Sequence, residues 1–281
     1  MKKHVLFSAA MVAAMTASAQ TGEITSNRGE NWLSQSGDWG LTFEATPLLN
    51  YAGNLFNGNQ NNNAPTLQNF FSSNSSNGSG VVIGGKKLID ANTAYRGKLR
   101  IGFGSNKSTE FVDDVTSTTN PPAIVEDVTK TNYLAVDLGA GLEKRVGSTR
   151  VVGIYGAEAH VGFGSGKNTF EYGNNLSATN SGTRTTESKQ GGTFQFGINA
   201  FGGVEWFCAP KISLSGEYAW GLNMTSNGAG ESTTERFDAA TNAIVSTTVE
   251  GSPNDDQTDK SSSFGIDTAV RGTIGINFYF Q

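Results

Sequence analysis

Apolar and polar residues alternate along the C-terminal end of the chain. From residue 264 to residue 280, nearly every second residue is apolar, as in Phe264, Ile266 and Ile274, and the residues between them are small, polar or charged. This period of two predicts a strand with one apolar and one polar face. The segment is longer than most globular strands but has the length of a tilted strand that crosses a bilayer. The chain also ends on aromatic residues, as transmembrane β-strands do.

The same alternation recurs in six further segments. They cover residues 39–51, 95–103, 132–144, 151–163, 194–206 and 212–224. A transmembrane barrel with both termini on one side needs an even number of strands. We therefore place an eighth strand at residues 81–89, where the alternation is poor.

The segments between these strands alternate in length. Residues 90–93, 145–149 and 208–210 are short connections, whereas residues 52–80, 105–130, 164–192 and 225–262 are long and rich in Asn, Ser, Thr and Gly. Outer-membrane barrels have short periplasmic turns and long extracellular loops. A soluble sandwich has no reason to separate its connections in this way. The sequence thus predicts an all-β fold, a closed antiparallel up-and-down transmembrane β-barrel of eight strands over residues 39–281.

The N-terminus has the features of an export signal. Lys2 and Lys3 precede an apolar stretch over residues 5–17, which is too short to span a membrane, and the sequence at 17–19 fits a cleavage site. We expect residues 1–19 to be a signal peptide, residues 20–38 a periplasmic segment, and the mature protein a multi-pass protein of the bacterial outer membrane. The single cysteine, Cys208, excludes an intramolecular disulfide, and the formal net charge of −5 argues against a nucleic-acid partner.

Three stretches resemble the strand–turn–strand units of small eight-stranded outer-membrane barrels, the OmpA/OmpX-type barrel domain. They are residues 85–104, 141–148 and 203–218. The resemblance implies insertion by the outer-membrane assembly machinery, which reads a C-terminal strand ending in an aromatic residue. Gln281 follows Phe280 here and departs from that pattern. Since the predicted barrel reaches residue 281, we expect no peptidoglycan-binding domain after it, unlike in full OmpA proteins.

Charged residues on the polar face of the strands should lie in the lumen. An eight-stranded barrel is so narrow that side chains fill it, and charges there should form pairs. The alternation assigns this polar lumen network to Glu44, Arg96, Lys98, Arg100, Asp137, Glu143, Glu158, His160, Glu205, Glu217, Asp267 and Arg271. Two interpretations stay open, a structural plug of ion pairs and a narrow polar conduit.

No enzymatic motif is present in an appropriate context. The Gly-x-Ser-x-Gly elbow is absent, and the Gly-x4-Gly-Lys sequence at residues 80–86 is followed by Lys87 instead of Ser or Thr. His160 and Glu158 point inward on one strand, where packing is expected. We therefore predict no catalytic residue, no cofactor and no metal site. Acidic residues at 231–259 could attract divalent cations, or simply keep a loop solvated.

These observations predict an outer-membrane protein with a structural or surface-interaction role through its long connections. Expected partners are outer-membrane lipid, lipopolysaccharide and the assembly machinery, and the sequence names no surface ligand. A narrow porin-like channel for small or apolar solutes, of the OmpW kind, is the alternative. A soluble periplasmic binding barrel is the third possibility.

Overall fold

The computed structural model describes residues 24–44, 83–251, 260–267 and 272–281. Twelve antiparallel strands dominate this part of the chain, and it contains no helix that could cross a membrane. The strands are β1 (Trp39–Glu44), β2 (Ile83–Asp90), β3 (Thr93–Asp113), β4 (Ile124–Val146), β5 (Val151–Glu171), β6 (Thr183–Lys189), β7 (Thr193–Ala209), β8 (Ile212–Asn227), β9 (Glu231–Asp238), β10 (Ala243–Glu250), β11 (Ser261–Asp267) and β12 (Gly272–Phe280). The predicted signal peptide and the predicted connection at 52–80 lie outside the described residues.

Eight strands close into a ring. The order is β1, β2, β3, β4, β5, β7, β8 and β12, and β12 returns to pair with β1. β11 and β12 pair with successive parts of β8, so the predicted C-terminal strand is present as two segments. The ring confirms the predicted all-β up-and-down barrel, including the strand at 81–89, which is β2. Closure removes free sheet edges from the ring.

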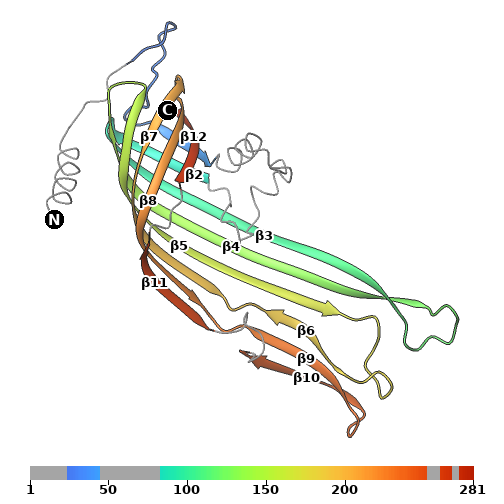
Figure 1. Ribbon diagram of the computed structural model, residues 1–281. Coiled ribbons are helices and arrows are strands. Elements are labelled where there is room, and N and C mark those ends of the chain that lie inside the picture. The colour runs from blue at the N-terminus through green and yellow to red at the C-terminus, as the bar shows by residue number, and fades with distance from the viewer. Residues whose placement is uncertain (1–23, 45–82, 252–259, 268–271) are drawn as a thin grey trace, which may run out of the picture.

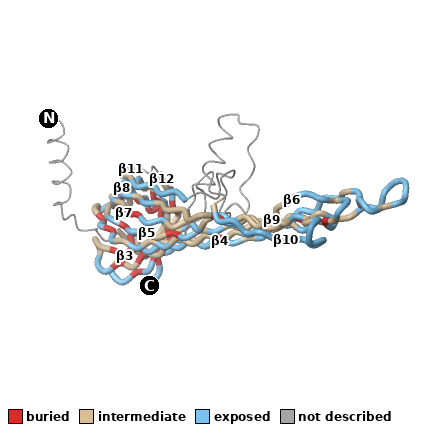
Figure 2. The backbone as a smooth tube through the Cα atoms, turned by 90° about the horizontal axis from the view of Figure 1, so that it is seen from below, coloured by how far each residue is buried: buried red, intermediate tan, exposed pale blue. Residues whose placement is uncertain are grey.

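The direction of the side chains also follows the predicted alternation. Leu99, Ile198 and Ile274 are 41, 50 and 38 % exposed, whereas Glu158 and Glu205 on the opposite parity are 9 and 0 % exposed. The barrel therefore has an apolar exterior and a charged interior. Figure 2 shows that the buried positions gather in the barrel.

The long connections differ from the prediction, because much of them is strand. β3, β4 and β5 run on well beyond the ring, and β6, β9 and β10 continue the sheet beside them (Figure 1). We call these outer parts of β3, β4 and β5, with β6, β9 and β10, the sheet extension. The prediction of loops over 105–130, 164–192 and 225–262 was wrong there. Polar Thr-rich segments such as Thr183–Lys189 can form strands when both faces of the sheet meet water, because Thr favours the extended conformation. Low hydrophobicity alone therefore does not predict a loop.

The short connections agree with the prediction. β2 ends at Asp90 and β3 begins at Thr93, and the other two short turns are similarly brief. Residues 24–38 pack against this turn end of the barrel. Leu33 is 5 % exposed and joins a small apolar cluster with Leu88, Phe207 and Tyr279.

Candidate functional site

The lumen contains a network of ion pairs centred on Glu143 of β4. The Glu143 carboxylate lies 2.8 Å from Lys86 Nζ, 2.8 Å from Arg145 Nη1 and 3.4 Å from Arg96 Nη1. The Glu143 side chain is fully buried, and the three cations come from β2, β3 and β4. Three positive charges around one buried carboxylate need further counter-ions, which the neighbouring strands supply.

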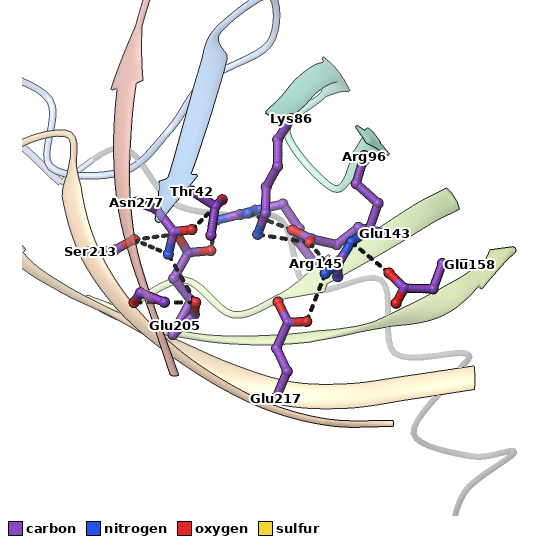
Figure 3. Close-up of polar contacts among 12 residues, drawn as sticks. Thr42, Lys86, Arg96, Glu143, Arg145, Glu158, Glu205, Ser213, Glu217 and Asn277 are labelled. Carbon is purple, nitrogen blue, oxygen red and sulfur yellow. Dashed lines mark hydrogen bonds and ion pairs between the residues drawn. The ribbon is translucent and has the colours of Figure 1, made fainter. Parts of the chain in front are cut away.

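Glu205 of β7 provides one of these counter-ions. Its carboxylate lies 2.7 Å from Arg145 Nη2 and accepts hydrogen bonds from the hydroxyls of Tyr279 (2.6 Å) and Ser213. The Arg145 guanidinium in turn donates to the Tyr279 oxygen at 3.2 Å. The side chains of Glu205 and Arg145 thus link β4, β7, β8 and β12. Figure 3 shows both side chains among the other charged groups of the lumen.

Arg96 of β3 links the ion pairs around Glu143 to a second group of carboxylates, Glu158 and Glu217. Its guanidinium lies 2.7 Å from Glu217 and 3.4 Å from Glu158, and its central carbon lies 4.0 Å from the centre of the Phe201 ring. Lys98, two residues along the same strand, lies 2.7 Å from Glu158. The cation on β3 is therefore fixed by carboxylates from β5 and β8 and by an aromatic face from β7.

A neutral hydrogen-bonded group lies beside these charges. The Asn277 amide donates to the hydroxyls of Ser213 and Ser215, both at 3.1 Å, and its oxygen accepts from Thr42 at 2.7 Å. Asn277 is 0 % exposed. The amide joins β12 to its two neighbours in the ring, β8 and β1, on the lumen side of the sheet.

A polar cavity of about 350 Å³ lies beside the ion-pair network. Arg100, Asp137 and His160 contribute to its wall, and it extends to Gln195 and Thr225, which are paired on β7 and β8. His160 Nδ1 lies 3.2 Å from Asn199 Nδ2. Among the described residues, no group of His, Cys, Asp and Glu side chains could hold a metal ion.

The turn end of the lumen is covered by the N-terminal segment. The backbone of Trp32 accepts a hydrogen bond from the Lys211 amide, and the Lys211 ammonium forms an ion pair with Asp38. The backbone of Leu88 exchanges hydrogen bonds with Gly37 and Asp38. Residues 32–38 are thereby joined to β2 and to the β7–β8 turn, and they lie across the barrel below the ion-pair network.

The structure brings together six of the residues that the alternation assigned to the lumen network. These are Arg96, Lys98, Glu143, Glu158, Glu205 and Glu217. Arg100, Asp137 and His160 line the cavity. Glu44 ends β1 and Asp267 ends β11, but their side chains, like the whole of Arg271, lie outside the described part of the structure.

Sequence reasoning missed two members of the network, Lys86 and Arg145. Lys86 lies in the strand with the weakest alternation, and Arg145 was assigned to a turn. The structure extends β4 to Val146, which places Arg145 on the same face as Glu143. The spacing of two between Glu143 and Arg145 is the signal that could have placed Arg145 in the lumen.

This arrangement favours a structural role for the charges. Glu158, the carboxylate nearest in sequence to His160, holds Lys98 and Arg96, so it is engaged in ion pairs. The bonded side chains come from strands around the whole ring, and each one links two or more strands. Buried ion pairs of this kind add little net stability compared with apolar packing, but the loss of one partner leaves a buried charge and is strongly destabilising.

The comparisons with known proteins return no relatives. No family model matches the chain, and neither the curated proteins nor the solved structures contain a match. The functional inference therefore depends on the geometry of this chain alone.

Proposed function

We propose that this chain is an integral outer-membrane β-barrel of the small OmpA/OmpX type, with a structural and surface-interaction role. The observation that carries this proposal is the apolar exterior of a closed ring. Large side chains such as Phe103, Phe163 and Trp220 are 77, 54 and 50 % exposed around the barrel. Soluble monomers rarely expose continuous apolar patches of more than a few hundred Å². Acyl chains are the surroundings that suit such a surface, and the pairing of β12 with β1 closes the ring, as a sheet within lipid requires.

The contacts at the turn end of the lumen favour this role over the channel. At the turn end, the ion pairs around Glu143 and the segment at residues 32–38 lie across the path that a solute would take. The polar cavity is lined by charges such as Arg100 and Asp137, which does not suit an apolar solute. A planar-bilayer recording should therefore show no reproducible conductance steps. Regular steps would support the narrow channel instead.

The sheet extension favours a role at the surface. β10 pairs only with β9, so one edge of β10 has no partner among the described strands. Residues 243–249 of β10 contain no charge, no Pro and no Gly, and Ile244 and Val249 are 49 and 45 % exposed. Natural sheets usually protect such an edge with charges or Pro. An unprotected edge can accept an extended segment of another protein as an added strand.

Fractionation of cells that express the full chain tests the proposal. We expect the protein in the outer-membrane fraction, and we expect its gel mobility to change on boiling, as it does for closed barrels. Recovery in the soluble fraction without detergent would contradict the proposal and would support the soluble periplasmic barrel. For the surface role, a Val245→Pro variant should keep the heat-modifiable barrel but bind less of any partner that pairs with β10, because Pro disrupts the strand.

A further inference from the structure

Four lysines lie together on the outward face of the sheet extension. Lys107 of β3 is directly opposite Lys130 of β4, and Lys167 of β5 is directly opposite Lys189 of β6. Asn132 pairs with Lys167, so Lys130 lies one step of the same face away from it. The two lysine pairs therefore occupy neighbouring positions across four consecutive strands. We call these four residues the lysine row.

The lysine row is not explained by the stability of the sheet. Like charges directly opposite each other on one face destabilise a pair of strands. Exposed ion pairs offset this repulsion only weakly. Such pairs are present at Lys130–Glu171 (2.5 Å), Lys167–Glu187 (2.6 Å) and Lys189–Glu231 (3.0 Å). Three carboxylates thus face four ammonium groups, and each ammonium carries three N–H donors. The cluster has an excess of positive charge and of hydrogen-bond donors.

The height of the lysine row relative to the apolar exterior identifies its environment. On β3, β4 and β5, the lysine lies four residues beyond Phe103, Leu134 and Phe163, which are 77, 49 and 54 % exposed on the same face. Four residues of a strand tilted by about 40° rise by about 10 Å along the membrane normal. The headgroup layer adds about 5–8 Å beyond the hydrocarbon on each side. Lysine side chains can extend several ångströms toward it, so the ammonium groups reach the headgroup level.

From this register we infer that the lysine row binds the phosphate groups of outer-leaflet lipid, with a phosphorylated glycolipid as the best match. This inference rests on the proposed membrane location of the barrel. A glycolipid with two phosphates can engage both opposed lysine pairs, and each phosphate places negative charge between two ammonium groups. The repulsion that the bare sheet carries is relieved in the bound state. The site assigns a specific lipid contact to one side of the barrel, the side formed by β3, β4, β5 and β6.

Lipid binding to the full chain tests this inference. The protein is folded in octyl glucoside, a detergent without phosphate, and native mass spectrometry measures the retention of bisphosphorylated lipid A and of its dephosphorylated form. We expect the phosphorylated lipid to be retained about tenfold better, as charge-assisted hydrogen bonds to phosphate predict. The variants Lys107→Gln/Lys130→Gln and Lys167→Gln/Lys189→Gln should each lose most of this preference. The corresponding Lys→Arg variants should keep it.

A matched control removes the same charge elsewhere. Lys87→Gln/Lys144→Gln acts at the turn end of the barrel and should leave the preference unchanged. Equal retention of both lipids by the unaltered protein would overturn the inference, as would an unchanged preference in the lysine-row variants. Displacement of the lipid by an equal concentration of inorganic phosphate would overturn the assignment to a lipid headgroup.

The proposed function can be judged separately in the same samples. A chain that keeps its heat-modifiable mobility and enters liposomes, but does not discriminate between the two lipids, contradicts only the lysine-row inference. A chain that never enters liposomes contradicts the membrane location itself.

Discussion

The barrel and the sheet extension share β3, β4 and β5, but the two faces of these strands meet different surroundings in the two regions. In the barrel, β3 carries Leu99 and Ile101 outward and Arg96 and Lys98 inward. Beyond the ring, residues 106–110 of the same strand are polar on both faces. β3 nevertheless remains a regular strand as far as Asp113. The hydrogen-bonded ladder alone therefore keeps the strand extended. The division into an apolar and a charged face appears only where one side meets a closed lumen.

The largest difference between the two regions should appear when a carboxylate is removed. Glu143→Ala deprives three buried cations of a shared counter-ion, and this should reduce the free energy of unfolding by about 3–5 kcal/mol. Glu171→Ala in the sheet extension removes only the exposed partner of Lys130. Urea titrations of both variants, folded into liposomes, measure the two effects. A loss of stability in Glu171→Ala as large as that in Glu143→Ala would mean that the two regions do not differ in this way.

The second largest difference in stability should appear when a charge is placed on the outward face of the barrel or of the sheet extension. Leu99→Lys inserts an ammonium into the apolar exterior, which costs about 2–4 kcal/mol near the middle of a bilayer. Thr109→Lys lies on the same face of the same strand but in the sheet extension, and such surface changes stay within about 0.5 kcal/mol. The same liposome unfolding assay compares the two. If Leu99→Lys is as stable as Thr109→Lys, then the exterior of the ring does not contact lipid.

Loss of β9 and β10 should reduce the stability of the barrel less than Glu143→Ala or Leu99→Lys does. Replacement of residues 231–250 by a short Gly-Ser linker removes β9 and β10, neither of which pairs with a strand of the ring. We expect the ring to keep its heat-modifiable mobility and its midpoint of urea unfolding. A shortened chain that no longer folds would show that the barrel depends on the sheet extension.

The smallest expected effect is a response of the sheet extension to acid. A hydrogen bond from Lys167 lowers the pKa of Glu187, with a smaller contribution from Lys189. A carboxylate with a lowered pKa stabilises the folded form above its unfolded pKa of 4.5, and this contribution is lost as the pH falls below that value. Amide hydrogen exchange in β6 should therefore quicken between pH 5 and roughly pH 3 by less than tenfold after correction for intrinsic rates. Glu187→Gln should remove the response, and a response that persists in that variant would contradict its assignment to Glu187.

The barrel could be predicted from the sequence because lipid and lumen impose opposite demands on neighbouring residues. The outward positions Leu99, Ile198 and Ile274 and the inward positions Glu158 and Glu205 follow from that alternation. The sheet extension could not be predicted in this way, because water on both faces leaves no alternation to read. Thr183–Lys189, for example, is a strand with no apolar residue.

The members of the lumen network were predictable only where a strand was clearly marked. Arg145 was missed because the end of a strand depends on its pairing with the neighbour, here Arg145 with Ile154. The packing of residues 32–38 against the turn end was missed for a similar reason. Only Trp32 and Leu33 are large and apolar in that segment, and their partners come from distant parts of the chain.

A scan of spin labels along β3 would show whether the apolar face of the barrel meets lipid. Single cysteines are placed at positions 97–113 in a Cys208→Ser background, labelled and reconstituted into liposomes, and the label's collision rates with oxygen and with a water-soluble nickel complex are measured. We expect that labels at positions 97, 99, 101 and 103 collide preferentially with oxygen, that labels at the positions between them do not, and that this period of two disappears beyond position 105. Labels at 99 and 101 that are as accessible to the nickel complex as the label at 109 would contradict the claim that the apolar face of the barrel meets lipid.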